Sequence, residues 1–267
     1  MLKKIIIAML FSLLFVQVDW DKIKDIGFVD KENTTRVMSN DKEYEFISIT
    51  DAVSGEQFWN FGFMYLVHNK NIDIDLIFKS ISFFCIFIFA LLVLVEGHYI
   101  MLLFLINPLI IDLCFSQFRS AFAFSLLCLA FILGKKRPYL TILILIPAVF
   151  IHTSVLLIIS IYFIMYIITN KFRNQKKKLI FFSCVIALVV SLILGPFRDA
   201  IFTYLNDRRA GLDYSHHSGF LFSIYWMILA VFFLIQRKDF YNNRVILTGI
   251  VLLFIYLINT LVLNIYG

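Results

Sequence analysis

Long, uninterrupted apolar runs are the feature that most constrains how this chain can fold. Hydrophobic residues make up 61% of the 267 residues and charged residues only 16%, against roughly a quarter in soluble domains. The runs are also longer than the alternating segments of about ten residues that form transmembrane barrels. In a bilayer, a continuous apolar run can hydrogen-bond its own backbone only as a helix. The sequence therefore predicts an all-α, polytopic integral membrane helical bundle.

The apolar runs predict about eight to nine transmembrane helices. They cover residues 1–18, 77–95, 99–115, 121–133, 139–168, 179–194, 220–235 and 245–263. The first run begins with two lysines and lacks a small-x-small cleavage site, so we prefer a retained span to a cleaved signal peptide. No internal repeat and no Gly- or Ser-rich linker interrupts the chain. We therefore expect a single membrane domain over residues 1–267.

The apolar run at residues 139–168 carries basic residues at both ends. Both flanks favour the cytoplasm by the positive-inside rule, and one helix cannot begin and end on the same side. The polar break at residues 151–154 is the natural place for the chain to turn back. The sequence thus predicts a short hairpin at 139–168, with His152 at an apex near the outer side of the membrane.

The charges outside the spans agree with this topology. Residues 19–75 hold twelve acids and six Lys/Arg and are predicted to form an outer acidic loop, with an aromatic interfacial helix at 57–67. The predicted inner segments carry 13 of the 24 Lys/Arg, so the net charge of +6 indicates membrane orientation rather than nucleic-acid binding. Residues 195–219 form an outer basic loop. One predicted inner turn, Glu96-Gly97-His98, has no basic residue of its own.

The cysteines and one Asp-x-Asp pattern are candidate metal or cofactor sites, and the sequence predicts neither. The four cysteines lie in or beside apolar runs without metal-ligand spacing, so we expect small buried hydrophobic side chains. They are Cys85, Cys114, Cys128 and Cys184. Asp73-Ile74-Asp75 matches the Asp-x-Asp pattern of sugar-nucleotide enzymes. It falls on the outer side, where nucleotide sugars are not expected, so we interpret it as a chance match.

Arginines at an outer membrane boundary are costly unless they are paired or functional. Arg119 begins a small-residue segment and either pairs with Asp112, two helical turns earlier, or binds an anion. Arg208 and Arg209 form a candidate diphosphate clamp, with Arg198 nearby, because guanidinium groups match phosphate oxygens. The alternative is a solvated loop in which the aspartates of the same loop balance these charges.

Histidines and one glutamate are the candidate acid–base groups. His152 is either a general base, a hydrogen-bond donor to substrate or a structural histidine. Glu56 precedes the aromatic helix and either faces a cavity or caps that helix. Secondary candidates are Tyr214, His216 and His217; the two adjacent histidines diverge too much to make a good zinc pair.

Several of these segments together resemble a known family. They are residues 116–123 (Ser-Gln-Phe-Arg-Ser-Ala-Phe-Ala), the basic turn at 135–139, residues 150–156 around His152, and residues 54–59 around Glu56. This order resembles the EpsG-like, Wzy-type polysaccharide polymerases over roughly residues 45–235. In that family an arginine opens a small-residue helix, and a basic cytoplasmic turn and a His-x-Ser element follow.

The resemblance implies a metal-independent glycosyltransferase that polymerises O-antigen, capsule or exopolysaccharide. A glycan on undecaprenyl diphosphate would be transferred to a sugar hydroxyl of a new lipid-linked repeat unit, on the outer face of the bacterial inner membrane. The arginines would hold the leaving diphosphate. His152 is the first candidate for the base, with His216, His217 or Glu56 behind it. A chain-length regulator protein is a candidate partner.

Three other classes compete with this interpretation. A transporter or flippase also uses broken helices, but no inverted repeat is visible and most spans lack acids for a proton relay. An O-antigen ligase would act on the same side of the membrane. A non-catalytic scaffold would explain the hydrophobicity but not the outward arginines.

Overall fold

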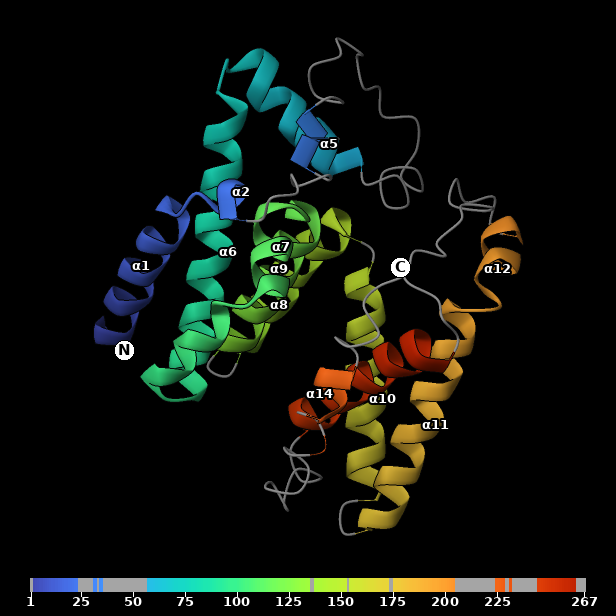
Figure 1. The fold of residues 1–267 in the computed structure, drawn as a ribbon. Coiled ribbons are helices and arrows are strands. Elements are labelled where there is room, and N and C mark those ends of the chain that lie inside the picture. The colour runs from blue at the N-terminus through green and yellow to red at the C-terminus, as the bar shows by residue number, and fades with distance from the viewer. Residues whose placement is uncertain are drawn as a thin grey trace. The chain divides into compact units, whose positions relative to one another are not determined.

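The computed structural model describes residues 2–23, 31–32, 34–35, 57–134, 137–152, 154–172, 175–204, 224–228, 231 and 244–262. Every regular element within these ranges is a helix, which confirms the all-α class (Figure 1). The chain divides into two compact units, Met1–Leu156 and Leu157–Gly267, and each is described by itself. A single membrane domain over residues 1–267 stays a prediction.

Fewer helices than predicted are long enough to cross a membrane. Among the described residues, three helices have the required length and apolar character: α6 (Ile74–Glu96), α10 (Ser154–Lys171) and α11 (Lys176–Leu194). A fourth span is counted if α7 (Pro108–Phe115) and α8 (Phe118–Gly134) act as one, although they are bent by 106°. The described residues thus indicate a helical membrane protein, and within them three to four helices qualify as spans, fewer than the predicted eight to nine.

Short helices explain the difference. The elements α1 (Leu2–Gln17), α9 (Pro138–Ile151) and α14 (Arg244–Leu257) have 16, 14 and 14 residues. At 1.5 Å per residue they span about 21 to 24 Å, less than a bilayer core of about 30 Å. Most of the run predicted at 220–235 lies outside the described residues.

The run predicted at residues 99–115 is broken rather than continuous. A 3₁₀ segment, η2 (Tyr99–Leu105), is followed by α7, which begins at Pro108. Asn107 caps α7 by accepting a hydrogen bond from the Leu109 N–H at 2.9 Å. Proline is favoured at the first helical position and disfavours helix in the residue before it, so the Asn107-Pro108 pair starts a new helix.

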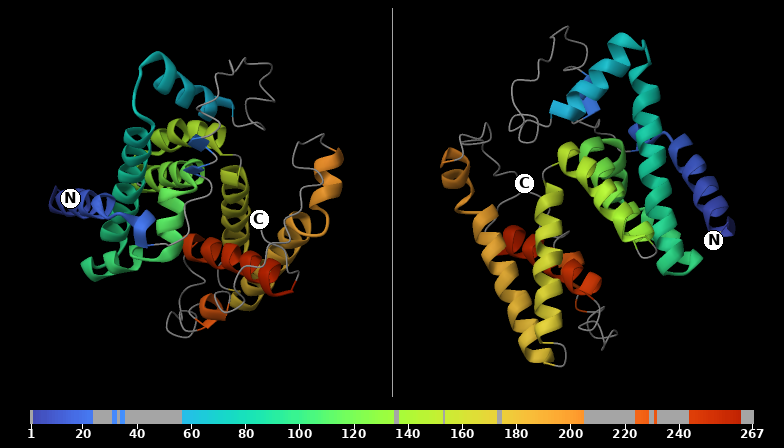
Figure 2. Two further views of the ribbon diagram at one scale, coloured as in Figure 1. Left: turned by 45° about the horizontal axis from the view of Figure 1, so that its top comes forward. Right: turned by 180° about the vertical axis from the view of Figure 1, so that it is seen from behind.

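In the first unit, α1 packs lengthwise against α6 (Figures 1 and 2). Its buried residues are Ala8, Ser12 and Phe15. The Lys4 Nζ donates to the Leu94 carbonyl, and the Lys3 Nζ lies 5.9 Å from the centre of the Tyr99 ring. The first helix is therefore part of this unit's core, and it brings two lysines to the turn after α6.

At the other end of α1 lies a short helix, α2 (Trp20–Ile23). The Trp20 ring lies 4.9 Å from Phe15 and 6.3 Å from Phe115 at the end of α7, between ring centres. The Trp20 indole N–H also donates to the Phe15 carbonyl at 2.9 Å. These contacts join the ends of α1 and α7.

Small residues of α8 are buried, and α6 is hydrogen-bonded to the end of α7. The buried small residues of α8 include Ala121, Ala123 and Ser125. The Ser82 Oγ of α6 donates at 2.7 Å to a buried carbonyl, that of Cys114. This bond satisfies one of the carbonyls that the end of α7 leaves without a helical partner.

The cysteines divide between two environments. Cys85 and Cys114 are buried as predicted, Cys128 is half-buried, and all four cysteines are free thiols. Cys184 on α11 is exposed, so its predicted burial is wrong. An apolar helix in a membrane can turn an apolar cysteine toward lipid at no cost, so hydrophobicity alone does not indicate which face is packed.

In the second unit, α10, α11 and α14 share one apolar core. It is formed by Ile161, Met165, Ala187, Leu247, Ile250, Val251 and Ile255. A short helix, α12 (Arg198–Tyr204), follows α11, and a π-helical turn, η4 (Ile258–Val262), ends the described chain. The Ser191 Oγ donates to the Ile255 carbonyl at 3.5 Å and links α11 to α14.

Candidate functional site

An aromatic cluster at one end of the first unit holds four helices together. The Phe78 and Phe118 rings stack at 4.3 Å, joining the start of α6 to the start of α8. Two residues of α5 (Gln57–Met64), Trp59 and Phe63, are buried in the same cluster. The last residue of α9, Ile151, packs against it. The cluster therefore brings together the segments that the sequence analysis identified around Glu56, Arg119 and His152.

A cavity of about 830 Å³ lies against this cluster. Its wall is apolar apart from Ser80 and the indole nitrogen of Trp59. The lining residues are Trp59, Gly62, Phe63, Leu66, Ile72, Leu76, Ile77, Ser80, Ile81, Phe84, Phe122, Ile146, Pro147, Phe150 and Ile151. A volume of this order accommodates a small molecule or part of a lipid chain, since ligand pockets have volumes of roughly 300 to 1,000 Å³.

The aromatic segment predicted as an interfacial helix forms part of this wall. It folds as α5 followed by a π-helical turn, η1 (Tyr65–Asn69). Trp59 and Phe63 are one turn apart and buried, whereas Phe61 is 45% exposed. The helix is confirmed, but its role in a cavity was missed. The spacing of Trp59 and Phe63, with Gly62 between them, was the signal that could have indicated it.

Arg119 is half-buried in the first turn of α8. It follows Phe118 of the cluster and precedes the lining residue Phe122 by three positions, so Arg119 and Phe122 share one face of the helix. The Asp112 carboxylate accepts a hydrogen bond from the Gln117 Nε2 at 3.3 Å. An ion pair between Asp112 and Arg119 stays a prediction.

His152 lies at the break between α9 and α10, where the sequence predicted one. Its backbone N–H donates to the Ala148 carbonyl at 3.0 Å, and its carbonyl accepts from the Val155 N–H at 3.1 Å. Its side-chain Nδ1 accepts from the Ser154 N–H at 3.3 Å, so the imidazole caps the first turn of α10. A hairpin folded at this point stays a prediction, because it depends on how the two units are placed.

The capping bond favours one tautomer of the neutral His152 ring. An Nδ1 that accepts a hydrogen bond is deprotonated, so the neutral ring carries its proton on Nε2 and can donate from there. His98 shows the same arrangement, with its Nδ1 accepting from the Ile100 N–H at 3.4 Å. Capping is thus a structural role of both histidines, and for His152 a donor role through Nε2 is compatible with it.

The structure places the remaining predicted residues as follows. Arg198 is half-buried at the start of α12 in the second unit, and its backbone N–H donates to the Gly195 carbonyl at 3.1 Å. Six further residues predicted as site residues lie outside the described part of the chain: Glu56, Arg208, Arg209, Tyr214, His216 and His217.

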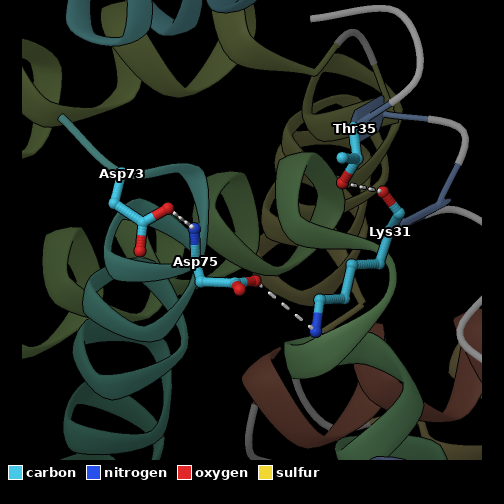
Figure 3. Close-up of polar contacts among 4 residues, drawn as sticks. All are labelled: Lys31, Thr35, Asp73 and Asp75. Atoms are coloured by element: carbon cyan, nitrogen blue, oxygen red, sulfur yellow. Dashed lines mark hydrogen bonds and ion pairs between the residues drawn. The ribbon is translucent and has the colours of Figure 1, made fainter. Parts of the chain in front are cut away.

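The Asp-x-Asp pattern at the start of α6 has a structural explanation (Figure 3). The Asp73 Oδ1 accepts from the Asp75 N–H at 3.4 Å and caps the helix. The Asp75 carboxylate pairs with the Lys31 Nζ at 3.9 Å, and the Thr35 hydroxyl donates to the Lys31 carbonyl at 2.9 Å. Within the described ranges no group of three His, Cys, Asp or Glu side chains could hold a metal ion.

The site that the described residues support is thus an apolar cavity between α5, α6, α8 and α9, with Arg119 and His152 beside two of its lining residues. The wall of the cavity suits an apolar chain, and Arg119 and His152 are not themselves among its lining residues. Comparison of the chain with protein-family models, with curated proteins and with solved structures found no match.

Proposed function

We propose that this protein is a multi-pass membrane polymerase that joins lipid-linked oligosaccharide repeat units at the outer face of the bacterial inner membrane. The observation that carries the proposal is the apolar cavity beside Arg119 and His152. The family resemblance of residues 116–123 and 150–156 supports it. In such a protein the shorter helices α1, α9 and α14 serve as further crossings, tilted or set in a thinned bilayer.

The two ends of an undecaprenyl-diphosphate substrate need different surroundings. The prenyl chain requires an apolar groove, and the cavity wall offers one with a single hydroxyl, that of Ser80. The diphosphate requires cations and hydrogen-bond donors. In this proposal the Arg119 guanidinium provides a permanent positive charge and hydrogen-bond donors. The His152 Nε2–H provides a neutral donor, and the hydrogen bond at Nδ1 holds the ring in position.

The reaction breaks the bond between the anomeric carbon and the diphosphate oxygen. The acceptor hydroxyl forms the new bond to that carbon and loses its proton to a base. Charge develops on the leaving diphosphate, where Arg119 and His152 stabilise it. With the His152 Nδ1 engaged as a cap, we assign the base role to Glu56, with His216 and His217 as alternatives.

A deletion strain tests the function directly. Loss of a polymerase leaves single repeat units on the lipid A core in a glycan gel, whereas loss of a ligase leaves none. Loss of a flippase traps the repeat unit on the inner leaflet. A normal ladder of long chains in the deletion strain would refute the proposal.

Variants then test the site. We expect Arg119→Ala to abolish long chains while the protein remains in the membrane at normal level. Arg119→Lys keeps the charge but not the planar fork and should restore only part of the ladder. The matched control is Arg137→Ala, an exposed arginine on the predicted inner side, which should leave the ladder unchanged. Equal ladders in the Arg119→Ala and Arg137→Ala strains would exclude the assigned role.

A further inference from the structure

The 3₁₀ segment η2 exposes large apolar side chains beside the end of a span-length helix. It follows α6 directly, after the turn Glu96-Gly97-His98. In Figure 1 the ribbon turns aside at this point from the line of α6. Side chains three positions apart lie above one another in a 3₁₀ helix, so η2 carries three ridges of side chains. The surroundings of each ridge indicate how the segment lies in the membrane.

One ridge of η2 faces the core of the first unit, and the other two do not. Leu102 and Leu105 of the first ridge are buried in the same hydrophobic cluster as residues of α1 and α6. Five apolar side chains form the other two ridges and are exposed: Ile100, Met101, Leu103, Phe104 and Ile106. The most exposed of them is Phe104, at 72%. A contiguous exposed surface of large apolar side chains marks a contact with a partner or a membrane.

The length and backbone of η2 exclude two placements in a bilayer. Its seven residues, at about 2.0 Å each, extend about 14 Å, which is half of a bilayer core of about 30 Å. The segment therefore cannot cross the membrane. The chain also bends at Ile106 and Asn107 before α7 begins, and irregular backbone that faces lipid does not occur in the hydrocarbon centre. The boundary between headgroups and acyl chains is the placement that remains for an apolar, lipid-facing segment.

Side chains typical of a membrane interface lie at the start of η2. The Lys3 Nζ lies 5.9 Å from the centre of the Tyr99 ring, and the Lys4 Nζ donates to the Leu94 carbonyl near the end of α6. Lysine and tyrosine suit this depth because their apolar parts contact acyl chains while the ammonium or hydroxyl group lies among the headgroups. These contacts indicate headgroup level whether or not either lysine also has an acidic neighbour.

We propose that the two exposed ridges of η2 lie in the interface of one leaflet, with the segment parallel to the membrane surface. Their apolar side chains would contact the upper acyl chains of phospholipids, and Lys3 and Tyr99 would lie among the headgroups. The segment would thus hold the Leu94 end of α6 at the membrane surface. The inference does not depend on glycan polymerisation, since no residue of η2 lines the cavity.

Spin labels on the full chain, reconstituted in phospholipid vesicles, measure this depth. Electron paramagnetic resonance reports how often a nitroxide collides with oxygen, which is concentrated among acyl chains, and with a water-soluble nickel chelate. The parent protein carries Cys184→Ser, because Cys184 is exposed whereas Cys85 and Cys114 are buried. The labelled parent without an added cysteine supplies the background signal.

Four single-cysteine variants place the segment between defined limits. Phe104→Cys reports the exposed face of η2. Leu188→Cys, exposed in the middle of α11, is the control for the hydrocarbon core, and Glu32→Cys, exposed in the predicted outer acidic loop, is the control for water. Leu102→Cys, on the buried ridge, is the control for a position covered by protein.

We expect the Phe104→Cys label to collide with both reagents, at a depth between those of the hydrocarbon and water controls. If this variant does not accumulate in membranes, Leu103→Cys on the neighbouring exposed ridge takes its place, with the same expected depth. Three results would overturn the proposal. A depth equal to that of Glu32→Cys would place η2 in water, and one equal to that of Leu188→Cys would place it in the hydrocarbon core. Rare collisions with both reagents, as for Leu102→Cys, would show that protein covers the segment.

Discussion

Substitutions of His152 can separate its capping role from its proposed chemical role. The two ring nitrogens have different assigned roles: Nδ1 accepts from the Ser154 N–H at 3.3 Å, and Nε2 is the nitrogen to which we assign the donor role in the proposed reaction. Asparagine places an oxygen near the position of Nδ1 and is a good helix cap. Glutamine places an amide nitrogen near the position of Nε2. Alanine provides neither group.

The expected magnitudes differ enough to be measured. Loss of a helix cap costs about 1 kcal/mol, and the long 3.3 Å bond favours the lower end of the range. A chain of this size responds with a fall in Tm of about 2 to 4 °C per kcal/mol. Loss of a donor to a developing oxyanion costs on the order of 10² to 10³ in rate. His152→Ala should show both effects.

The assays are thermal unfolding in detergent and the length of the glycan ladder in a complemented deletion strain. His152→Asn should keep the Tm and lose long chains, while His152→Gln should lower the Tm and keep part of the ladder. A full ladder in His152→Asn would show that His152 is only a cap. An unchanged Tm in His152→Ala would show that the capping bond contributes nothing to stability.

Three further substitutions test packing and the cavity. Ser82→Ala should lower stability by about 1 kcal/mol in thermal unfolding, because it removes a buried 2.7 Å hydrogen bond, whereas Ser80→Ala, whose 2.7 Å bond is exposed, should change the Tm little. Gly134→Ala should lower the free energy of unfolding by about 1 to 3 kcal/mol, because the added Cβ would meet the Thr141 Oγ1. The double variant with Thr141→Ala should recover part of this loss. If the stability losses of the two single variants simply add in the double variant, the clash is contradicted. Gly62→Leu has room for its Cβ and projects into the cavity wall, so it should keep the Tm but shorten the ladder. Displacing two lipid methylenes at about 0.8 kcal/mol each weakens binding roughly tenfold, and a normal ladder would argue against a lipid chain in the cavity.

Some features of this protein follow from the sequence because they are local. A run of apolar residues must hydrogen-bond its own backbone in lipid, so the all-α class needed no knowledge of packing. The break at His152 is also local, since a polar segment interrupts two apolar runs. The aromatic helix predicted at 57–67 is also a local feature, and it folds as α5 followed by the π-helical turn η1. The lengths of the helices were harder to predict from the sequence. The apolar run at 99–115, for example, is divided at Asn107-Pro108 although its hydropathy continues through that point.

Other features were decided only by tertiary structure. The turn at Glu96-Gly97-His98 has no basic residue of its own, yet the packing of α1 against α6 brings Lys3 and Lys4 to it. The cavity is assembled from two pairs of neighbouring helices, α5 with α6 and α8 with α9, and the two pairs are separated in the sequence by η2 and α7. The burial of Cys85 and the exposure of Cys184 depend on which helix faces meet. In a soluble amphipathic helix the polar face marks the solvent side, so the opposite, apolar face is the packed one. A helix that is apolar on every face carries no such signal.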